Sequence, residues 1–326
     1  MSRTWLGVLC VLSLVAFVAV AAPALAQDAA NTAEPSGPMT EGGDALPAWG
    51  WALVLLVVTF IMGILAVLGG VGGGVLFVPI VSGFFPFHLD FVRGTGLLVA
   101  LSGALAAGPG LLRMGLASLR LAIPVALIAS SCAIVGAMIG LALPTNIVQT
   151  ALGATILGIC VLMLTAKKSE LPEVKQADKL SSALRIYGVY HEASTNEIID
   201  WKVHRTPLGL CLFVIIGVMA GMFGLGAGWA NVPVLNLLMG APLKISVATS
   251  KFLLSITDTS AAWIYINKGC VIPMMVVPSL VGIMLGSFVG VRILRVVKPG
   301  VVRWIVIGML AFAGLKALSK GLNLGF

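Results

Sequence analysis

The feature that most constrains this chain is a glycine-rich interruption of an apolar region, which occurs twice. Gly70-Val-Gly-Gly-Gly74 precedes Val78-Pro79, and Gly224-Leu-Gly-Ala-Gly228 precedes Val232-Pro233, with each landmark shifted by 154 positions. The same offset relates further pairs without a gap: Thr95 and Thr249, Gly115 and Gly269, Pro124 and Pro278, Gly136 and Gly290. This register predicts an internal duplication with an interrupted hydrophobic segment at the same point of each copy. In transporters built from repeats, such paired interruptions are the best sequence pointer to a binding site.

Composition places the chain in a membrane. Of its 326 residues, 59% are hydrophobic and only 10% are charged, and the mean hydropathy is +1.09. The long apolar runs predict an all-α polytopic membrane protein that has the lipid bilayer as its solvent. The net charge of +8 comes from Lys and Arg gathered in a few loops rather than on one basic face. That distribution fits the positive-inside rule, and we expect no nucleic-acid partner.

The N-terminal region is predicted to be a targeting segment followed by a linker. Residues 1–26 combine the positive charge of Arg3, an apolar stretch and the small-x-small sequence Ala24-Leu-Ala26, which predicts a cleaved signal peptide. An uncleaved first helix is the alternative. In both cases residue 27 begins on the exported side, and the Asp/Glu/Pro/Gly/Ser-rich residues 27–47 are predicted to be a disordered exported linker.

The rest of the chain divides into a first membrane repeat (48–166), an insert (167–206) and a second membrane repeat (207–326). The insert interleaves seven basic with six acidic residues. Its alternating segments 184–192 and 198–204, separated by a turn at 193–196, predict a small β-hairpin. A lid, a docking point for a partner and a plain connector are the three interpretations of this hairpin.

Loop charges predict the topology. If each break lies within a crossing pair, each copy crosses five times, and the insert and the loops with Arg113, Arg120 and Lys244 are cytoplasmic. An odd number of crossings makes the two copies an inverted repeat. The alternative is four crossings plus a re-entrant hairpin per copy, which would export the insert with its seven basic residues. Charge favours the first arrangement, in a bacterial inner membrane with the N-terminus on the exported side.

The two breaks are the first candidate site. Irregular backbone at membrane depth is tolerated only inside protein or along a water-filled cavity, and glycine lets another group approach the backbone. A helix that starts after a break presents free N–H groups and a positive dipole end, so two facing breaks would bind an anion. Close helix packing is the alternative role. The candidate substrate-binding glycines are Gly70, Gly72, Gly74, Gly224, Gly226 and Gly228.

Two charged residues within one predicted span form the second candidate. Lys251 and Asp258 are seven residues apart, about 700° of helix, and therefore lie on nearly one face, with Ser255 between them. Each costs about 2.5–3.5 kcal/mol at a helix centre on insertion scales, so such residues normally face the interior. Lys251 could bind an anion and Asp258 could carry a coupling proton. A structural pair bridged through water or Ser255 is the alternative.

Hydroxyl groups near these positions extend the candidate substrate set to Thr95, Thr249 and Ser250, which could bind an oxyanion or bond within their own helices. Arg93, at a predicted exported helix end, could attract an anion or be an ordinary interfacial residue. His88, His191 and His204 lack ligand spacing, and no catalytic triad or Walker sequence occurs. We therefore expect neither catalytic residues nor a metal or other cofactor.

At these residues the chain resembles the TauE/SafE sulfite-exporter family of bacterial membrane proteins. The resemblance rests on both glycine motifs with their Val-Pro pairs, on Ala248-Thr-Ser250, and on the hairpin end Trp201-Lys-Val-His-Arg205. It covers about residues 50–320. It implies a secondary transporter for small anions, with sulfite and organosulfonates as typical substrates. The chain departs from the family in its signal-like N-terminus, its exported linker and Lys251.

The leading hypothesis is a secondary anion transporter with alternating access about the two breaks. A non-transporting assembly or accessory protein that uses the hairpin to dock a partner is the main alternative. A membrane enzyme would need a catalytic group beyond Lys251 and Asp258, and a metal permease would need His, Cys or Met ligands on span faces. A homodimer and a monomer are both compatible with the sequence.

Overall fold

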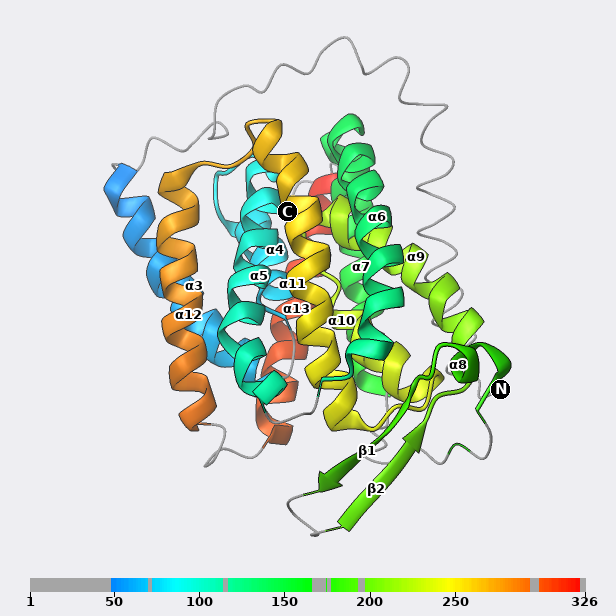
Figure 1. Cartoon of the computed structure of the whole chain (residues 1–326). Helices are drawn as coiled ribbons and strands as arrows, with labels where there is room; N and C mark the ends of the chain where they lie inside the picture. The colour runs from blue at the N-terminus through cyan, green and yellow to red at the C-terminus, as the bar shows by residue number, and fades with distance from the viewer. Residues whose placement is uncertain are drawn as a thin grey trace.

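A computed structural model describes residues 48–69, 72–113, 117–165, 174, 177–192, 197–293 and 299–322. The predicted signal peptide, the exported linker and Gly70 lie outside these residues. The described part is a bundle of helices with one β-hairpin at its lower end in Figure 1. Its helices are α3 (Ala48–Gly69), α4 (Gly73–Phe84), α5 (Leu89–Arg113), α6 (Leu119–Ala142), α7 (Thr145–Thr165), α8 (Lys179–Ala183), α9 (Thr206–Phe223), α10 (Gly228–Pro233), the π-helix η2 (Val234–Leu238), α11 (Leu243–Asn267), α12 (Pro273–Ile293) and α13 (Pro299–Gly321).

Local chemistry explains where these helices begin and end. Ser118 accepts a hydrogen bond from the Leu121 N–H at the start of α6, which is the usual role of an N-cap serine. Proline stands in the first turn of α9, α12 and α13, where its missing N–H costs nothing. Gly224 ends α9 in the left-handed conformation with φ +68°, which glycine adopts without a steric penalty.

Six of the described helices are long and apolar enough to cross a membrane, namely α3, α5, α6, α7, α9 and α12. Helices α11 and α13 have similar lengths of 25 and 23 residues. The segments after the breaks are short, with 12 residues in α4 and 6 in α10. The polytopic helical fold is therefore confirmed, and the number of crossings stays a prediction.

The helices repeat with the offset of the sequence motifs. Leu89, Leu119 and Thr145 begin α5, α6 and α7, and the residues 154 positions later, Leu243, Pro273 and Pro299, begin α11, α12 and α13. Packing is reciprocal: α3 packs on α12 while its counterpart α9 packs on α6, and α5 and α7 pack on their own counterparts α11 and α13. Two copies related by a two-fold axis would pair in this way. Their inverted orientation stays a prediction.

Glycine contacts repeat with the same reciprocity. A Cβ atom on Gly63 of α3 would lie 2.7 Å from the Ile283 carbonyl oxygen of α12, and one on Gly217 of α9 would lie 2.5 Å from the Ala129 oxygen of α6. Gly217 follows Gly63, and Ile283 follows Ala129, by 154 positions. Corresponding glycines thus bring corresponding helix pairs together, as small residues do in membrane bundles.

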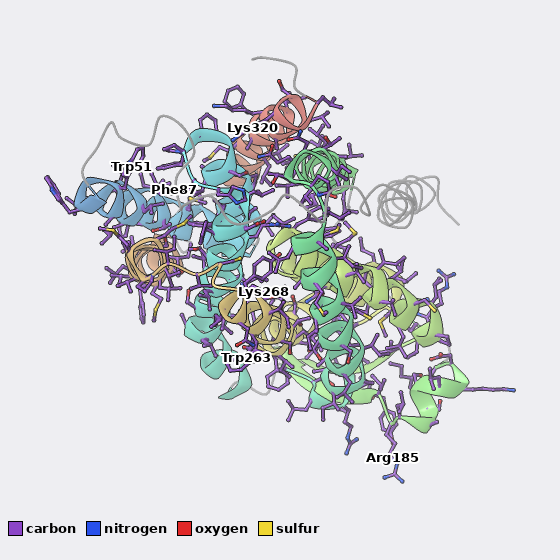
Figure 2. The ribbon with its side chains drawn as sticks, turned by 90° about the horizontal axis from the view of Figure 1, so that it is seen from above. Trp51, Phe87, Arg185, Trp263, Lys268 and Lys320 are labelled. Atoms are coloured by element: carbon purple, nitrogen blue, oxygen red, sulfur yellow. The ribbon has the colours of Figure 1, made fainter. Side chains whose placement is uncertain are left out.

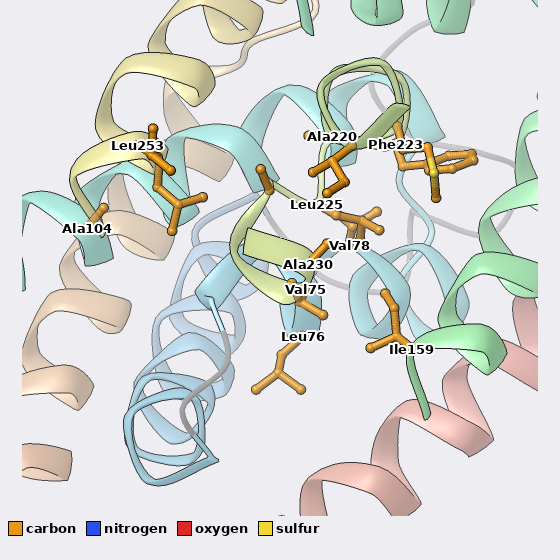
Figure 3. Close-up of a cluster of buried hydrophobic side chains, with 14 of the residues drawn as sticks. Val75, Leu76, Val78, Ala104, Ile159, Ala220, Phe223, Leu225, Ala230 and Leu253 are labelled. Atoms are coloured by element: carbon orange, nitrogen blue, oxygen red, sulfur yellow. The ribbon is translucent and has the colours of Figure 1, made fainter. Parts of the chain in front are cut away.

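The core lies where α4 and the second break meet. Figure 3 shows Val75 and Val78 of α4 near Leu225 and Ala230, all of which are buried in one hydrophobic cluster. At one end of the bundle, the Trp51 and Phe87 rings lie 5.7 Å apart between centroids. Figure 2 shows these two side chains on the α3 side and Arg185 of the insert at the opposite edge.

The insert contains the predicted hairpin. Strand β1 (Tyr187–Glu192) runs antiparallel to β2 (Glu197–Lys202), with Tyr187 opposite Lys202 and Glu192 opposite Glu197. The predicted turn at 193–196 lies outside the described residues. The side of the membrane on which the hairpin lies stays a prediction.

Hydrogen bonds tie the insert to the second repeat. The Asp178 carboxyl accepts hydrogen bonds from the Ser181 N–H at 3.3 Å and from the Thr206 N–H and hydroxyl at 3.2 and 2.8 Å. Burial alone would raise the pKa of Asp178, but these hydrogen bonds from Ser181 and Thr206 outweigh it and lower the pKa. The His204 N–H donates to the Met239 carbonyl at 2.9 Å. The base of the insert therefore contacts both the start of α9 and the end of η2.

A substitution at Gly136 would test the close approach of α6 and α9. Its Cβ position is occupied by the Val218 backbone, so Gly136→Ala should lower the stability of the purified protein in detergent by about 1–3 kcal/mol through overpacking. Among the residues that the structure describes, nothing outside the helix's own backbone lies within 4 Å of the Cβ position of Gly308 in α13, and Gly308→Ala is the matched control. Thermal melting would measure both, and equal melting temperatures would contradict the packing described here.

Candidate functional site

The two glycine breaks meet in the structure. A Cβ atom on Gly72 would lie 4.0 Å from the Gly228 Cα, and one on Gly74 would lie 2.6 Å from the Leu225 carbonyl oxygen and 2.9 Å from that of Gly96. No side chain fits at Gly74. Four of the predicted glycines, Gly72, Gly74, Gly226 and Gly228, therefore lie in one region, whereas Gly70 is outside the described residues.

The second break has a backbone that favours glycine. Gly224 and Gly226 have φ angles of +68° and +71°, in the left-handed region that other residues rarely adopt. A Cβ atom on Gly226 would lie 2.8 Å from the Asp258 Oδ2. Conformation and space thus both select glycine at 226, where the break lies against the Asp258 carboxyl.

Asp258 of α11 is the charged group at the break. It is 1% exposed, the Ala227 N–H is directed toward it, and neither carboxyl oxygen completes a hydrogen bond among the described residues. Lys251, two turns earlier on α11, interacts with it electrostatically without direct ion-pair contact in the described part of the chain. A buried carboxyl that lacks donors is costly in its charged form.

Ser255 does not bridge the two charges. Its hydroxyl donates to the Phe252 carbonyl at 2.7 Å, within the same helix. The counterparts of Lys251 and Asp258 in the first copy, Leu97 and Ala104, are buried and apolar. The charged pair therefore makes the two halves of the molecule unequal.

The predicted hydroxyl groups are placed differently. Thr249 accepts a hydrogen bond from the Ser118 N–H at 3.1 Å, at the start of α6. It lies nine residues before Asp258, about 13 Å along the helix, so α6 rather than the break is its contact. Thr95 and Ser250 are both buried, and the Thr95 hydroxyl has no hydrogen-bond partner among the described residues.

The structure places Arg93 differently from either prediction made from the sequence. It is neither an interfacial residue nor exposed to an arriving anion, because only 1% of it is exposed. Its Nη1 donates to the Gly140 and Met222 carbonyls at 2.9 Å each, and its Nη2 pairs with Asp90. Tyr265 also donates to the Met222 carbonyl, at 3.3 Å. These groups satisfy the end of α9 just before the second break.

Sequence reasoning did not find the Arg93 contacts. Asp90, three residues earlier, could have indicated a pair within the helix, but the carbonyl partners lie 47 and 129 positions away. Two further buried polar groups were also missed, the Trp229 indole N–H and the Asn231 amide. Asn231 corresponds to Phe77 of the first copy, and this replacement of an apolar by a polar residue could have indicated a functional position.

Metal ligation has no geometric basis in the described part of the chain, where no three His, Cys, Asp or Glu side chains cluster. The reactive groups that do gather at the breaks are one carboxyl and several neutral polar side chains. Such a set can bind and release a proton or a small polar ligand.

Together, the multi-pass helical fold and this polar centre define the class of a membrane transporter. The chain belongs to the sulfite exporter TauE/SafE family, whose model matches residues 55–317. It is similar to the probable membrane transporter protein YunE of Bacillus subtilis, with 21% identity over 83% of this chain and 98% of the relative. It is also similar to the probable membrane transporter protein MJ0441 of Methanocaldococcus jannaschii, with 25% identity over 80% and 93% of the two chains. No solved structure is significantly similar to the chain.

The Arg93 contacts give a stability prediction. Arg93→Met removes the guanidinium partner of Asp90 and of the buried Gly140 carbonyl, so it should lower stability by about 3–5 kcal/mol. The Met222 carbonyl keeps its hydrogen bond from Tyr265. Arg120, exposed at the start of α6, is the control, and Arg120→Met should melt like the wild type. Thermal melting in detergent would compare them, and an unchanged melting temperature for Arg93→Met would refute the structural role.

Proposed function

We propose that the chain is a secondary transporter, or permease, for a small anion, with sulfite, an organosulfonate or a related sulfur oxyanion as substrate. Membership of the sulfite exporter family supports this substrate class. The single observation that carries the mechanism is the Asp258 carboxyl, buried against Gly226 where the two breaks meet. An ionisable residue at such a position in a transporter marks a substrate or proton pathway.

The proposed mechanism divides the tasks between the two charged residues of α11. Lys251 attracts the anion, and Asp258 takes up or releases a proton as the anion binds. Because Asp258 in its charged form would repel an anion nearby, binding is favoured when this carboxyl is protonated. Such coupling links the anion flux to the pH gradient.

Alternating access would use the two breaks as the points of movement. The segments on either side are short, and α10 continues into the π-helix η2, a form that occurs often at functional sites. The reciprocal packing of the two copies supports an inverted repeat that rocks about this centre. We place the protein in the bacterial inner membrane, with the N-terminus exported and the hairpin cytoplasmic.

Lys251 provides the first test. Lys251→Met should raise the KM for sulfite by about 10- to 100-fold, because one charged hydrogen-bonding partner of the anion is removed. Radiolabelled sulfite, thiosulfate and a short sulfonate would be measured in proteoliposomes. Lys268, exposed at the end of the same helix, is the control, since Lys268→Met should leave the KM unchanged. An unchanged KM for Lys251→Met would move the anion site away from this side chain.

Asp258 provides the second test. Asp258→Asn keeps the shape and removes the titratable proton, so accumulation driven by a pH gradient should fall to background while anion exchange between equal pH values persists. Asp200→Asn, at an exposed position of strand β2, is the control for loss of a carboxylate. Gradient-driven accumulation that persists in Asp258→Asn would contradict proton coupling at this residue.

The same flux assay distinguishes a transporter from the alternative of a non-transporting accessory protein. The hairpin exposes Tyr187 and Val189, which a docking role would need. Under the transport proposal, Val189→Glu leaves flux in proteoliposomes intact. Wild-type protein that is folded but moves none of the tested anions would favour the alternative.

A further inference from the structure

The second copy carries polar side chains around its break where the first copy is apolar. Asn231 and Asp258 are each 1% exposed. Their counterparts 154 positions earlier are Phe77 and Ala104. Because burying polar groups costs free energy, their concentration at one break indicates a local requirement rather than a feature of the fold.

Asn231 stands out within this group. Neither its amide nitrogen nor its amide oxygen has a hydrogen-bond partner among the described residues, and the same holds for the nearby Trp229 indole nitrogen. The amide supplies two N–H donors and the indole supplies one. Buried donors of this kind normally have an acceptor, so the Asn231 amide calls for a partner that carries an acceptor.

The position of Asn231 follows from two contacts. Its backbone N–H donates to the Ala227 carbonyl at 3.1 Å, which places it one turn after the break. The second contact is that of Ala227 itself, whose backbone N–H is directed toward the Asp258 carboxyl of α11. Asn231 therefore lies one helical turn beyond the point where the break meets α11.

We infer that Asn231 is a substrate-binding residue of the transporter and donates its amide N–H to an oxygen of a sulfur oxyanion. The oxygens of such an anion are acceptors, which complements the unpaired amide donor of Asn231. The second copy therefore supplies this contact to the anion. This inference rests on the proposed anion transport and adds the donor that recognises the substrate.

The test uses Asn231→Leu, which keeps the size of the side chain and removes its polar atoms. Without a ligand role, this change removes unpaired buried groups and leaves transport unaffected. With a ligand role, the KM for sulfite should rise by about 10- to 100-fold, and the increase in melting temperature on adding sulfite should disappear. In both cases the melting temperature without sulfite should equal or exceed that of the wild type.

Asn236 is the matched control. It is buried in the same segment, but its amide donates to the Ala241 carbonyl at 2.8 Å. Asn236→Leu should therefore lower the melting temperature and leave the KM for sulfite within about twofold of the wild type, since no contact with the anion is lost. If Asn231 binds the substrate, Asn231→Leu therefore raises the KM without lowering the melting temperature, and Asn236→Leu lowers the melting temperature without raising the KM.

Each outcome decides the inference. If the wild type binds sulfite and Asn231→Leu has the same KM and the same sulfite-dependent melting shift, the role of Asn231 is overturned while the transport proposal stands. If the wild type shows neither flux nor a melting shift with sulfite, thiosulfate or a short sulfonate, both fall. Should Asn231→Leu fail to fold, Asn231→Ala is measured in its place, with the same expected rise in KM.

Discussion

The close approach of two chain interruptions is the constraint on which the rest of the structure depends. Gly74 lies so near the carbonyl oxygens of Leu225 and Gly96 that no side chain fits. Backbone at membrane depth needs its polar groups satisfied within the protein, and the facing breaks, with α5 and α11 beside them, enclose each other. Only glycine permits that contact, and the reciprocal pairs α3 with α12 and α9 with α6 hold the two halves around it.

The two copies share one helical framework, and the positions at which their residues differ are the candidates for a functional role. Where both copies keep the same residues, as at the glycines that join corresponding helices, the role is packing. Where the second copy has Lys251 and Asp258 in place of Leu97 and Ala104, stability alone offers no reason for the change. The unequal polar content concentrates the chemistry on the side of α10 and α11, although the backbone frame is repeated.

Much of this fold could be predicted from the sequence, because apolar runs and glycine landmarks are local signals. The offset of 154 positions predicted which helices correspond, and alternation predicted the hairpin. The site was harder, because its partners are distant in the chain. Thr95 and Thr249 match in sequence, yet only Thr249 has a hydrogen bond, to a backbone N–H 131 positions away. The buried contacts of Arg93 and the unpaired amide of Asn231 likewise depend on helix packing that periodicity does not describe.

The two sides of the second break differ in how their polar groups are satisfied. Before it, the last carbonyls of α9 receive hydrogen bonds from Arg93 and Tyr265, and a positive charge at a helix C-terminus is favourable. After it, the side chains of Asp258, Trp229 and Asn231 complete no hydrogen bond among the described residues. A group that is satisfied in the resting structure has little to gain from a ligand, whereas an unsatisfied one gains the full hydrogen bond. Under the proposed transport, the free energy available for binding therefore lies on the α10 and α11 side, where the buried polar groups are unpaired.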